Sequence, residues 1–404
     1  MGREIAALVH GNRVGLSSPM TRPPIAVALL PLLLASVGST AATARSWTDR
    51  QGRKFDASLV ASDAVRATFR LPDGRKTVVA ITSLSSDDSA FVREWRNTNR
   101  DAPLIDPESM PPWPADVTAE SYEVKIAAED RATGAIRYAS PHFEIASDVK
   151  LPLGVVRDLA AVFEATRAAV MTVPLALHSG DDQRPYAVRL CSTPDSYQAA
   201  GGPAGSGGFF NGGEMLILLP NLGIRPTTNG LTAEHQKSLF VLKHEVSHQV
   251  VGRWTMAQPT WLNEGIAELF AAAPYIRGKY TFQNLESGLQ AYVLKWRKSP
   301  DSRSLRLVAP PRLMAMSRRE WMEQVMAQGA YDLYNSSALL AYWFVRYDGR
   351  GDGAGLASYY DALHRGVPPE EAERTYLLRG RSREQLTAEI QKLAKKMALS
   401  VEMD

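Results

Sequence analysis

Two histidines four positions apart, His244 and His248, are the residues of this 404-residue chain best suited to hold a metal ion. On a helix, positions i and i+4 lie one turn apart on the same face, so both imidazoles can bind one small cation. Glu245 lies between them, and the pattern H-E-x-x-H on a helix is typical of zinc sites. A carboxylate beside the ion, rather than on it, can take a proton from water at the metal. The spacing therefore predicts one zinc ion per chain.

A second acidic stretch, WLNEGIAELF, follows the turn predicted at Gln258-Pro259 and is expected to form a short helix. Glu264 in this stretch can supply a third ligand and leave the fourth position open to water, which distinguishes a catalytic zinc site from a closed structural one. Glu268 lies four residues later on the same helical face, where it can accept the remaining N–H of a ligating histidine. The competing interpretation is a pair of amphipathic helices whose polar residues face solvent.

The segments HEVSH and WLNEGIAE together resemble the gluzincin metallopeptidases, in which the third ligand is the Glu of an Asn-Glu-x-x-Ala segment. This resemblance implies three zinc ligands, His244, His248 and Glu264. It makes Glu245 the general base and acid of the reaction, and Glu268 the residue that orients a ligand histidine. His235, nine residues before His244, would face away from the metal.

A third stretch, AYDLYNSSALLAYWFVRY, resembles the Tyr-x-x-Ser helix of gluzincins. The resemblance favours Tyr334, followed by Ser337, as the donor of a hydrogen bond to the oxyanion that develops in the transition state. Tyr331 and His364 are alternative donors. A tyrosine at helical spacing beside leucines is more often a core side chain, so a structural role for Tyr334 is the competing interpretation.

Composition limits the class of protein. A chain of this length with 45% apolar residues can form two or more domains with a sizeable core. Its formal net charge is only +3, so no broad basic surface predicts a nucleic-acid partner. The single cysteine, Cys191, excludes an intramolecular disulfide and lies in the apolar run YAVRLC, where a packed core thiol is expected.

Residues 1–44 have the features of a signal peptide. Arg22 precedes an apolar run from Pro24 to Val37, and small residues then end in Ala42-Thr43-Ala44. The apolar run is short for a membrane-spanning helix, so an uncleaved anchor is the less favoured alternative. We expect export, to the periplasm or the medium, with cleavage after Ala44. Met20 is an alternative start.

Residues 45–98 predict a small β-domain, because short runs of alternating apolar residues are separated by turn signals such as Pro72-Asp73-Gly74. The segment also resembles the SH3-like homology domain of a yeast endocytic adaptor, which binds Asn-Pro-Phe peptides. The matching residues are Arg45, Trp47, Asp49, Gly52, the Asp73-Gly74 turn, Leu84-Ser85 and Asp88. The resemblance implies a peptide or surface partner, and a spacer role is the alternative. Five prolines within 99–118 predict a stiff linker.

Residues 119–404 are the expected peptidase domain, which makes the whole chain α+β. The resemblance implies two lobes, with a small sheet and one or two helices above a mostly helical lobe, and the metal helix at the floor of the cleft. The pattern predicts strands over 136–147 and 186–191 and a helix over 153–170. Further helices are expected at about 232–254, 283–298, 318–328, 332–346, 354–364 and 383–398, the last opened by a Ser382–Gln385 capping box. The glycine-rich segment 201–213 is either an edge strand that a peptide could join or a hairpin loop.

These features together predict an exported, zinc-dependent metallopeptidase that acts on a peptide or protein substrate. Two other classes fit parts of the sequence. One is a zinc-containing protein of gluzincin fold that binds without turnover, and the other is a cell-surface protein whose β-domain does the binding. Glu245 favours the enzyme, because a protein without turnover has no use for a base at that position.

Overall fold

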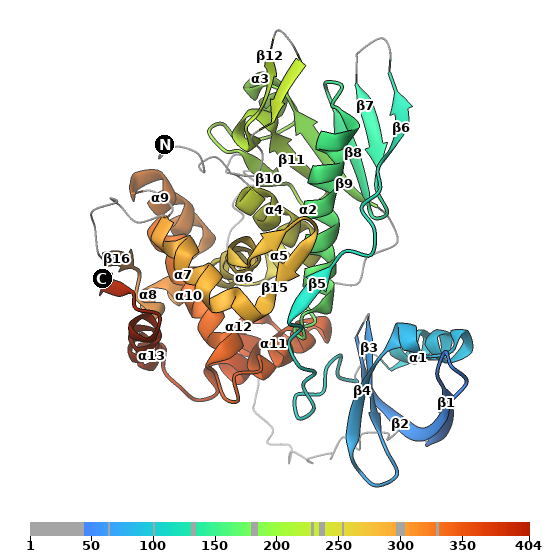
Figure 1. Cartoon of the computed structure of the whole chain (residues 1–404). Coiled ribbons are helices and arrows are strands. Elements are labelled where there is room, and N and C mark those ends of the chain that lie inside the picture. Colours follow the sequence, from blue (N-terminus) through green and yellow to red (C-terminus); the bar gives the residue numbers. More distant parts are fainter. Residues whose placement is uncertain are drawn as a thin grey trace, which may run out of the picture.

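The computed structural model describes residues 44–63, 65–99, 102–130, 135–178, 185–227, 230–233, 239–252, 254–295, 304–328 and 331–404. The expected signal peptide, apart from Ala44, lies outside these ranges, and so does His235. Among the helices described, none is both long and apolar enough to cross a membrane. The fold is mixed, with a sheet at the N-terminal end and a mostly helical C-terminal region, in agreement with the predicted α+β class (Figure 1).

The N-terminal unit is a four-stranded antiparallel sheet with one helix. Its strands pair in chain order: β1 (Arg45–Thr48), β2 (Lys54–Ser62), β3 (Arg66–Arg70) and β4 (Lys76–Ala80). The alternating residues bury a core around Trp47 and Phe69. The sequence pattern did not predict the helix α1 (Ser86–Thr98). Its N-cap is Ser85, whose hydroxyl accepts a hydrogen bond from the Asp88 N–H.

Residues 102–115 contain neither helix nor strand, as the prolines predict, but side chains on both sides hold them in place. Leu104 N–H donates to Asp361 Oδ1 over 2.8 Å, and Trp113 Nε1 donates to the Asp352 carbonyl over 3.1 Å. Toward the β-domain, Lys76 Nζ lies 2.6 Å from Asp106 Oδ2. The predicted linker, residues 99–118, extends too far. Its last three residues form the strand β5 (Asp116–Thr118), which pairs with β15 (Lys279–Thr281).

Arg66 of the β-domain contacts the larger unit directly. Its two terminal nitrogens donate to the carbonyls of Thr172 and Val173, over 2.8 and 3.1 Å. These carbonyls lie at the end of α2 (Leu153–Thr172), where a cation is favourable because of the helix dipole. Asp63 holds the same guanidinium, with Oδ2 at 2.9 Å from Nη2. The β-domain is therefore joined to the larger unit by side chains as well as by the chain.

The upper part of the larger unit is a six-stranded sheet in the order β10-β11-β9-β8-β7-β6 (Figure 1). Strands β8, β9 and β11 are parallel, and the other three add antiparallel to the edges. The strands are β6 (Lys125–Glu129), β7 (Ile136–Ala139), β8 (Phe143–Ser147), β9 (Tyr186–Cys191), β10 (Gly208–Phe210) and β11 (Glu214–Leu218). The strand over 186–191 is confirmed. The single strand expected over 136–147 is wrong, because the chain turns at Ser140–His142 and makes a hairpin.

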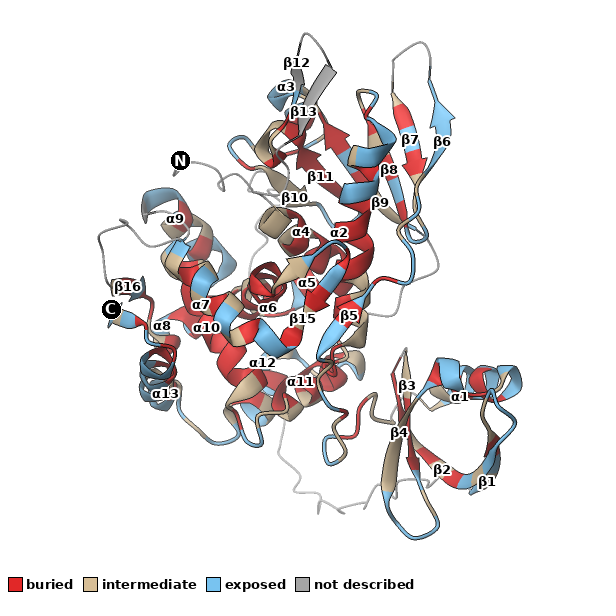
Figure 2. Ribbon diagram, in the orientation of Figure 1, coloured by how far each residue is buried: buried red, intermediate tan, exposed pale blue. Residues whose placement is uncertain are grey.

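The lower part is helical and contains most of the buried side chains (Figure 2). Its helices are α4 (Leu239–Val251), α5 (Trp254–Ala257), α6 (Thr260–Ala272), α7 (Leu285–Lys295), α8 (Pro310–Ala315), α9 (Arg318–Gln328), α10 (Tyr331–Arg346), α11 (Ala354–His364), α12 (Pro369–Ala372) and α13 (Arg383–Lys396). The helices expected over 283–298, 318–328, 332–346, 354–364 and 383–398 are confirmed to within a few residues. The Ser382–Gln385 capping box is also present.

Thr232 and Ala233, at the start of the helix expected from about 232 to 254, belong instead to β13 (Gly230–Ala233), which pairs with β12 (Ile224–Thr227). Residues 234–238 lie outside the described ranges, and the helix is described from Leu239. It ends at Val251, and Gly252, with a φ of +69°, separates it from α5. The segment that matters for the site, HEVSH, lies well inside α4, which packs against α2 on one side and α6 on the other.

Candidate metal centre

Two neighbouring helices bring the three expected ligands together. His244 and His248 lie on one face of α4, while Leu242, Val246 and Val250 bury the rest of the helix in the core. The chain then turns at Gln258–Pro259, as predicted, and α6 begins at Thr260. Glu264 therefore lies on the second turn of α6, against the histidine face of α4.

The atoms that would bind a metal converge. His244 Nε2 and His248 Nε2 are 3.0 Å apart, and Glu264 Oε2 is 3.3 Å from the first and 3.6 Å from the second. In a tetrahedral zinc site with bonds of ~2.0–2.1 Å, ligand atoms lie roughly 3.3–3.4 Å from one another. The three observed separations bracket that value. His244, His248 and Glu264 thus form a group that could hold a metal ion.

The charge around this group favours a cation. The side chains of His244, His248 and Glu264 are only 14%, 9% and 13% exposed, so water screens them poorly. Burial opposes ionisation of Glu264, but the charge of His248 and hydrogen bonds from both histidines hold its pKa well below the usual range. Glu245 and Glu268 add two further carboxyl groups, so three acidic side chains surround two imidazoles.

Glu268 lies where a residue that orients His244 is expected. Its Oε1 is 3.1 Å from His244 Nδ1, and its side chain is 6% exposed. A proton on Nδ1 would be donated to this carboxylate, which leaves the Nε2 lone pair directed toward the other two ligands. Among the described residues, the second oxygen, Oε2, has no hydrogen-bond partner although it is buried. A buried carboxylate oxygen without a donor fits a site whose negative charge is balanced by a bound cation.

Glu245 lies beside the candidate ligands, close enough to interact electrostatically with His244 and His248. Within the part of the chain that the structure describes, its carboxyl group forms no hydrogen bond or ion pair. Burial raises the pKa of this carboxyl, and the charges of His244 and His248 offset the effect only in part. A carboxyl group with a raised pKa and no fixed partner is suited to accept and release a proton.

Tyr334, the favoured oxyanion donor, packs beside a candidate ligand. Its ring centroid is 6.0 Å from that of His244 and 5.7 Å from that of Trp321. Burial, together with the charges of Glu264 and Glu268, raises the pKa of the phenol well above 10, so it stays protonated and can donate. Tyr331, the first residue of α10, is 37% exposed. His364 packs on Trp254, with ring centroids 4.9 Å apart, and its Nε2 lies 3.3 Å from the Ala176 carbonyl.

The glycine-rich segment proves to contain both of the expected features. Gly208–Phe210 form the edge strand β10, and the preceding residues form a loop. The glycines are required for space: a Cβ at Gly202 would lie 2.3 Å from the Tyr197 ring, and one at Gly207 2.3 Å from Asn221 Nδ2. A Cβ at Gly208 would lie 2.8 Å from Glu245 Cγ. Sequence reasoning did not connect Gly208 with the site, although the density of glycines was a signal that the chain approaches other groups closely.

A further glycine determines how closely α10 approaches α6. A Cβ at Gly265, the residue after Glu264, would lie 2.5 Å from the Ser337 carbonyl oxygen and 2.9 Å from Ala341 Cβ. The two helices can therefore touch at their backbones directly beside Glu264, a candidate ligand. This close approach brings Tyr334, one turn before Ser337, to the side of His244.

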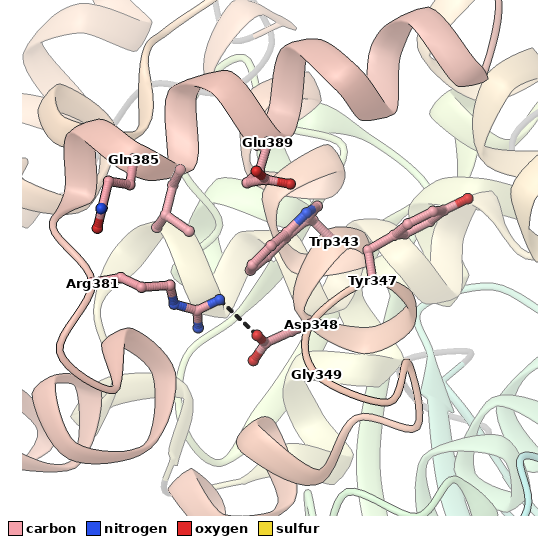
Figure 3. A pocket seen from close by; sticks show the side chains of 8 residues that line it. Trp343, Tyr347, Asp348, Gly349, Arg381, Gln385 and Glu389 are labelled. Carbon is pink, nitrogen blue, oxygen red and sulfur yellow. Dashed lines mark hydrogen bonds and ion pairs between the residues drawn. The ribbon is translucent and has the colours of Figure 1, made fainter.

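A separate hollow of about 340 Å³ lies between the end of α10 and α13 (Figure 3). Trp343, Arg381 and Glu389 are among the residues that line it. Its buried carboxylate, Asp348, is already paired with two arginines, and Oδ1 lies 2.7 Å from Arg381 Nη1. The hollow offers no group of metal ligands, so it does not compete with the histidine site.

The chain matches no protein-family model, and no curated protein is significantly similar to it. What the protein does must therefore be argued from the residues of the site themselves.

Proposed function

We propose that the protein is a zinc-dependent peptidase. The observation that carries the proposal is the group His244–His248–Glu264 with Glu268 on the Nδ1 side of His244, because this set provides three ligands and the hydrogen bond that orients one of them. The three ligands leave a fourth position for water. A zinc ion held there would lower the pKa of that water toward ~7 and polarise a carbonyl oxygen.

Two residues beside the ligands, Glu245 and Tyr334, would then take part in hydrolysis. As water adds to the carbonyl carbon of the scissile bond, Glu245 takes its proton. Tyr334 donates a hydrogen bond to the oxygen on which negative charge develops. Glu245 next gives its proton to the nitrogen as the carbon–nitrogen bond breaks, so the products are a carboxylic acid and an amine. The pKa directions support these roles: the pKa of Glu245 is raised, and that of Tyr334 is raised well above 10, which keeps the phenol protonated.

An extended peptide is the substrate class that the surroundings favour. Strand β10 pairs with β11 along one edge, and within the described ranges no strand occupies its other edge. Since Gly208 of this strand lies against Glu245, a peptide that added to the open edge would run past the base. We also propose export, on the basis of the signal-like segment that begins at Arg22.

Two variants test the proposal. Purified protein should contain close to one zinc ion and hydrolyse members of a mixed peptide library, and His248→Ala should lose both the zinc and the hydrolysis. Glu245→Gln keeps all three ligands, so it should retain zinc while hydrolysis falls by ~10²-fold or more, the contribution expected of a general base. Zinc bound equally by wild type and His248→Ala would exclude the assigned site. A zinc-loaded wild type that cleaves no peptide would replace the enzyme by a zinc-containing binding protein.

A further inference from the structure

Gly208 lies so close to the Glu245 side chain that no residue with a Cβ fits at position 208 without displacing it. A Cβ built on Gly208 would lie 2.8 Å from Glu245 Cγ and 3.2 Å from both Cδ and Oε1, whereas ordinary contacts begin at 3.4 Å. The φ of Gly208 is not in the left-handed region, so its backbone does not require glycine. The requirement is for space alone, and the group that fills the space is the candidate base.

Strand β10 cannot easily move away from Glu245. Phe209 packs on one face of the sheet against the cluster around Cys191, and Phe210 packs on the other face against the main core. The strand is also paired with β11, with Phe209 opposite Leu216. Immediately before it, Gly207 is enclosed by the Asn221 side chain. These contacts fix the height of β10 above α4.

The backbone of Glu245 is held in place by its neighbours on α4. The residues that follow it on α4, Val246 and Ser247, are buried. The atom nearest the added Cβ is Cγ, in the middle of the side chain, so rotation of the carboxyl group alone would not relieve the overlap. A side chain at position 208 must therefore change the Glu245 rotamer and move its carboxylate away from the ligands.

We propose that Gly208 is a positioning residue for Glu245: its missing side chain leaves the space in which the carboxylate is held beside His244 and His248. The proposal rests on the proposed function, in which Glu245 is the base. The contact must open by about 0.6 Å to reach 3.4 Å. A displacement on the order of 1 Å in a reacting group can cost ~10²-fold in rate.

Gly208→Ala should therefore lower kcat by roughly 10–10²-fold without changing KM or the zinc content. Gly213→Ala is the matched control, because it lies in the same hairpin and its Cβ would meet only Asn211 Oδ1, at an ordinary 3.7 Å. The control should keep the wild-type kcat. If Gly208→Ala instead raises KM and leaves kcat unchanged, position 208 acts on the substrate strand and the proposal is wrong.

A second measurement uses metal-free protein and needs no turnover. Gly208→Ala should lower the urea midpoint of unfolding in the wild-type background. It should have no such effect in Glu245→Ala, which removes the Cγ that the new methyl group would meet. An equal loss in both backgrounds would mean that the methyl group disturbs β10 and not Glu245, which overturns the proposal. Because this cycle is independent of catalysis, a wild type without peptidase activity would refute the proposed function while the cycle still decides the contact.

Discussion

Replacing Gly265 by alanine tests how closely α6 and α10 must pack for the site to form. The new Cβ would lie 2.5 Å from the Ser337 carbonyl oxygen, 2.9 Å from Ala341 Cβ and 3.0 Å from the Ser337 carbonyl carbon. Two of these atoms belong to the backbone of α10, so no side-chain rotation relieves the overlap. The two helices must separate locally by about 0.9 Å to restore a contact of 3.4 Å.

Two opposing effects determine the change in the free energy of unfolding. Alanine favours a helix over glycine by about 1 kcal/mol at an interior position. Overpacking of a core contact costs about 1–3 kcal/mol, and a collision with backbone belongs in the upper part of that range. The overlap should therefore dominate and leave Gly265→Ala less stable than wild type by about 1–2 kcal/mol. Separation of the helices also moves Glu264, the adjacent ligand, so zinc affinity should fall as well.

Urea unfolding of the metal-free protein, followed by circular dichroism, measures the first effect without a contribution from zinc. Gly154→Ala is the matched control, since Gly154 also lies in a helix, α2, but no atom lies within 4 Å of its added Cβ. The control should be as stable as wild type or gain up to about 1 kcal/mol. A Gly265→Ala protein as stable as the control would show that α6 and α10 are not in backbone contact, and the packing argument would fail.

Four further substitutions give separate expectations. Glu268→Gln should weaken zinc binding by roughly 10–100-fold, and unchanged affinity would mean that Glu268 does not orient His244. Tyr334→Phe should lower kcat by about 10²–10³-fold at constant zinc content, and an unchanged kcat would make Tyr334 a core side chain only. Arg66→Ala should speed proteolysis within residues 102–115, while the exposed Arg53→Ala should not. Burial raises the pKa of Asp361 above 3.8, so its contribution to stability is present at low pH and lost as the pH rises through the folded-state value. The urea midpoint of Asp361→Asn relative to wild type should accordingly increase as the pH rises from below 3.8 through the folded-state pKa of Asp361, and a constant difference would refute the shift.

Much of the candidate metal-binding group could be predicted because its geometry is local. The four-residue spacing of His244 and His248 fixes their shared face on any helix, and the same holds for Glu264 and Glu268 on α6. That α6 would lie against the histidine face of α4 was not a local property. It came from the resemblance of two segments, and the distances among the four side chains agree with it.

What the sequence did not predict depends on contacts between distant segments. The need for glycine at 208 and 265 arises from Glu245 and Ser337, which are far away along the chain. Residues 232–233 were wrongly assigned to the metal helix because they pair with β12, and such pairing overrides a helical pattern. The hairpin within 136–147 had a local signal in Pro141, which alternation of apolar residues alone did not take into account.

The contacts of Arg66 and of residues 102–115 with the larger unit hold the β-domain at a fixed distance from the candidate metal centre, which would limit the peptides that both units could bind at once. A flexible tether gives a captured peptide a broad range of distances to a second site, with an effective concentration set by the tether's length. Here the carbonyls of Thr172 and Val173, together with Asp361, fix one distance in place of that range. A peptide bound by the β-domain would then reach Glu245 only if the interval between its bound residues and its scissile bond matched that distance. If the protein is the peptidase proposed above and its β-domain binds the same peptide, the two units would together select substrates by length, and shortening or lengthening the 102–115 segment would change which bond is cut.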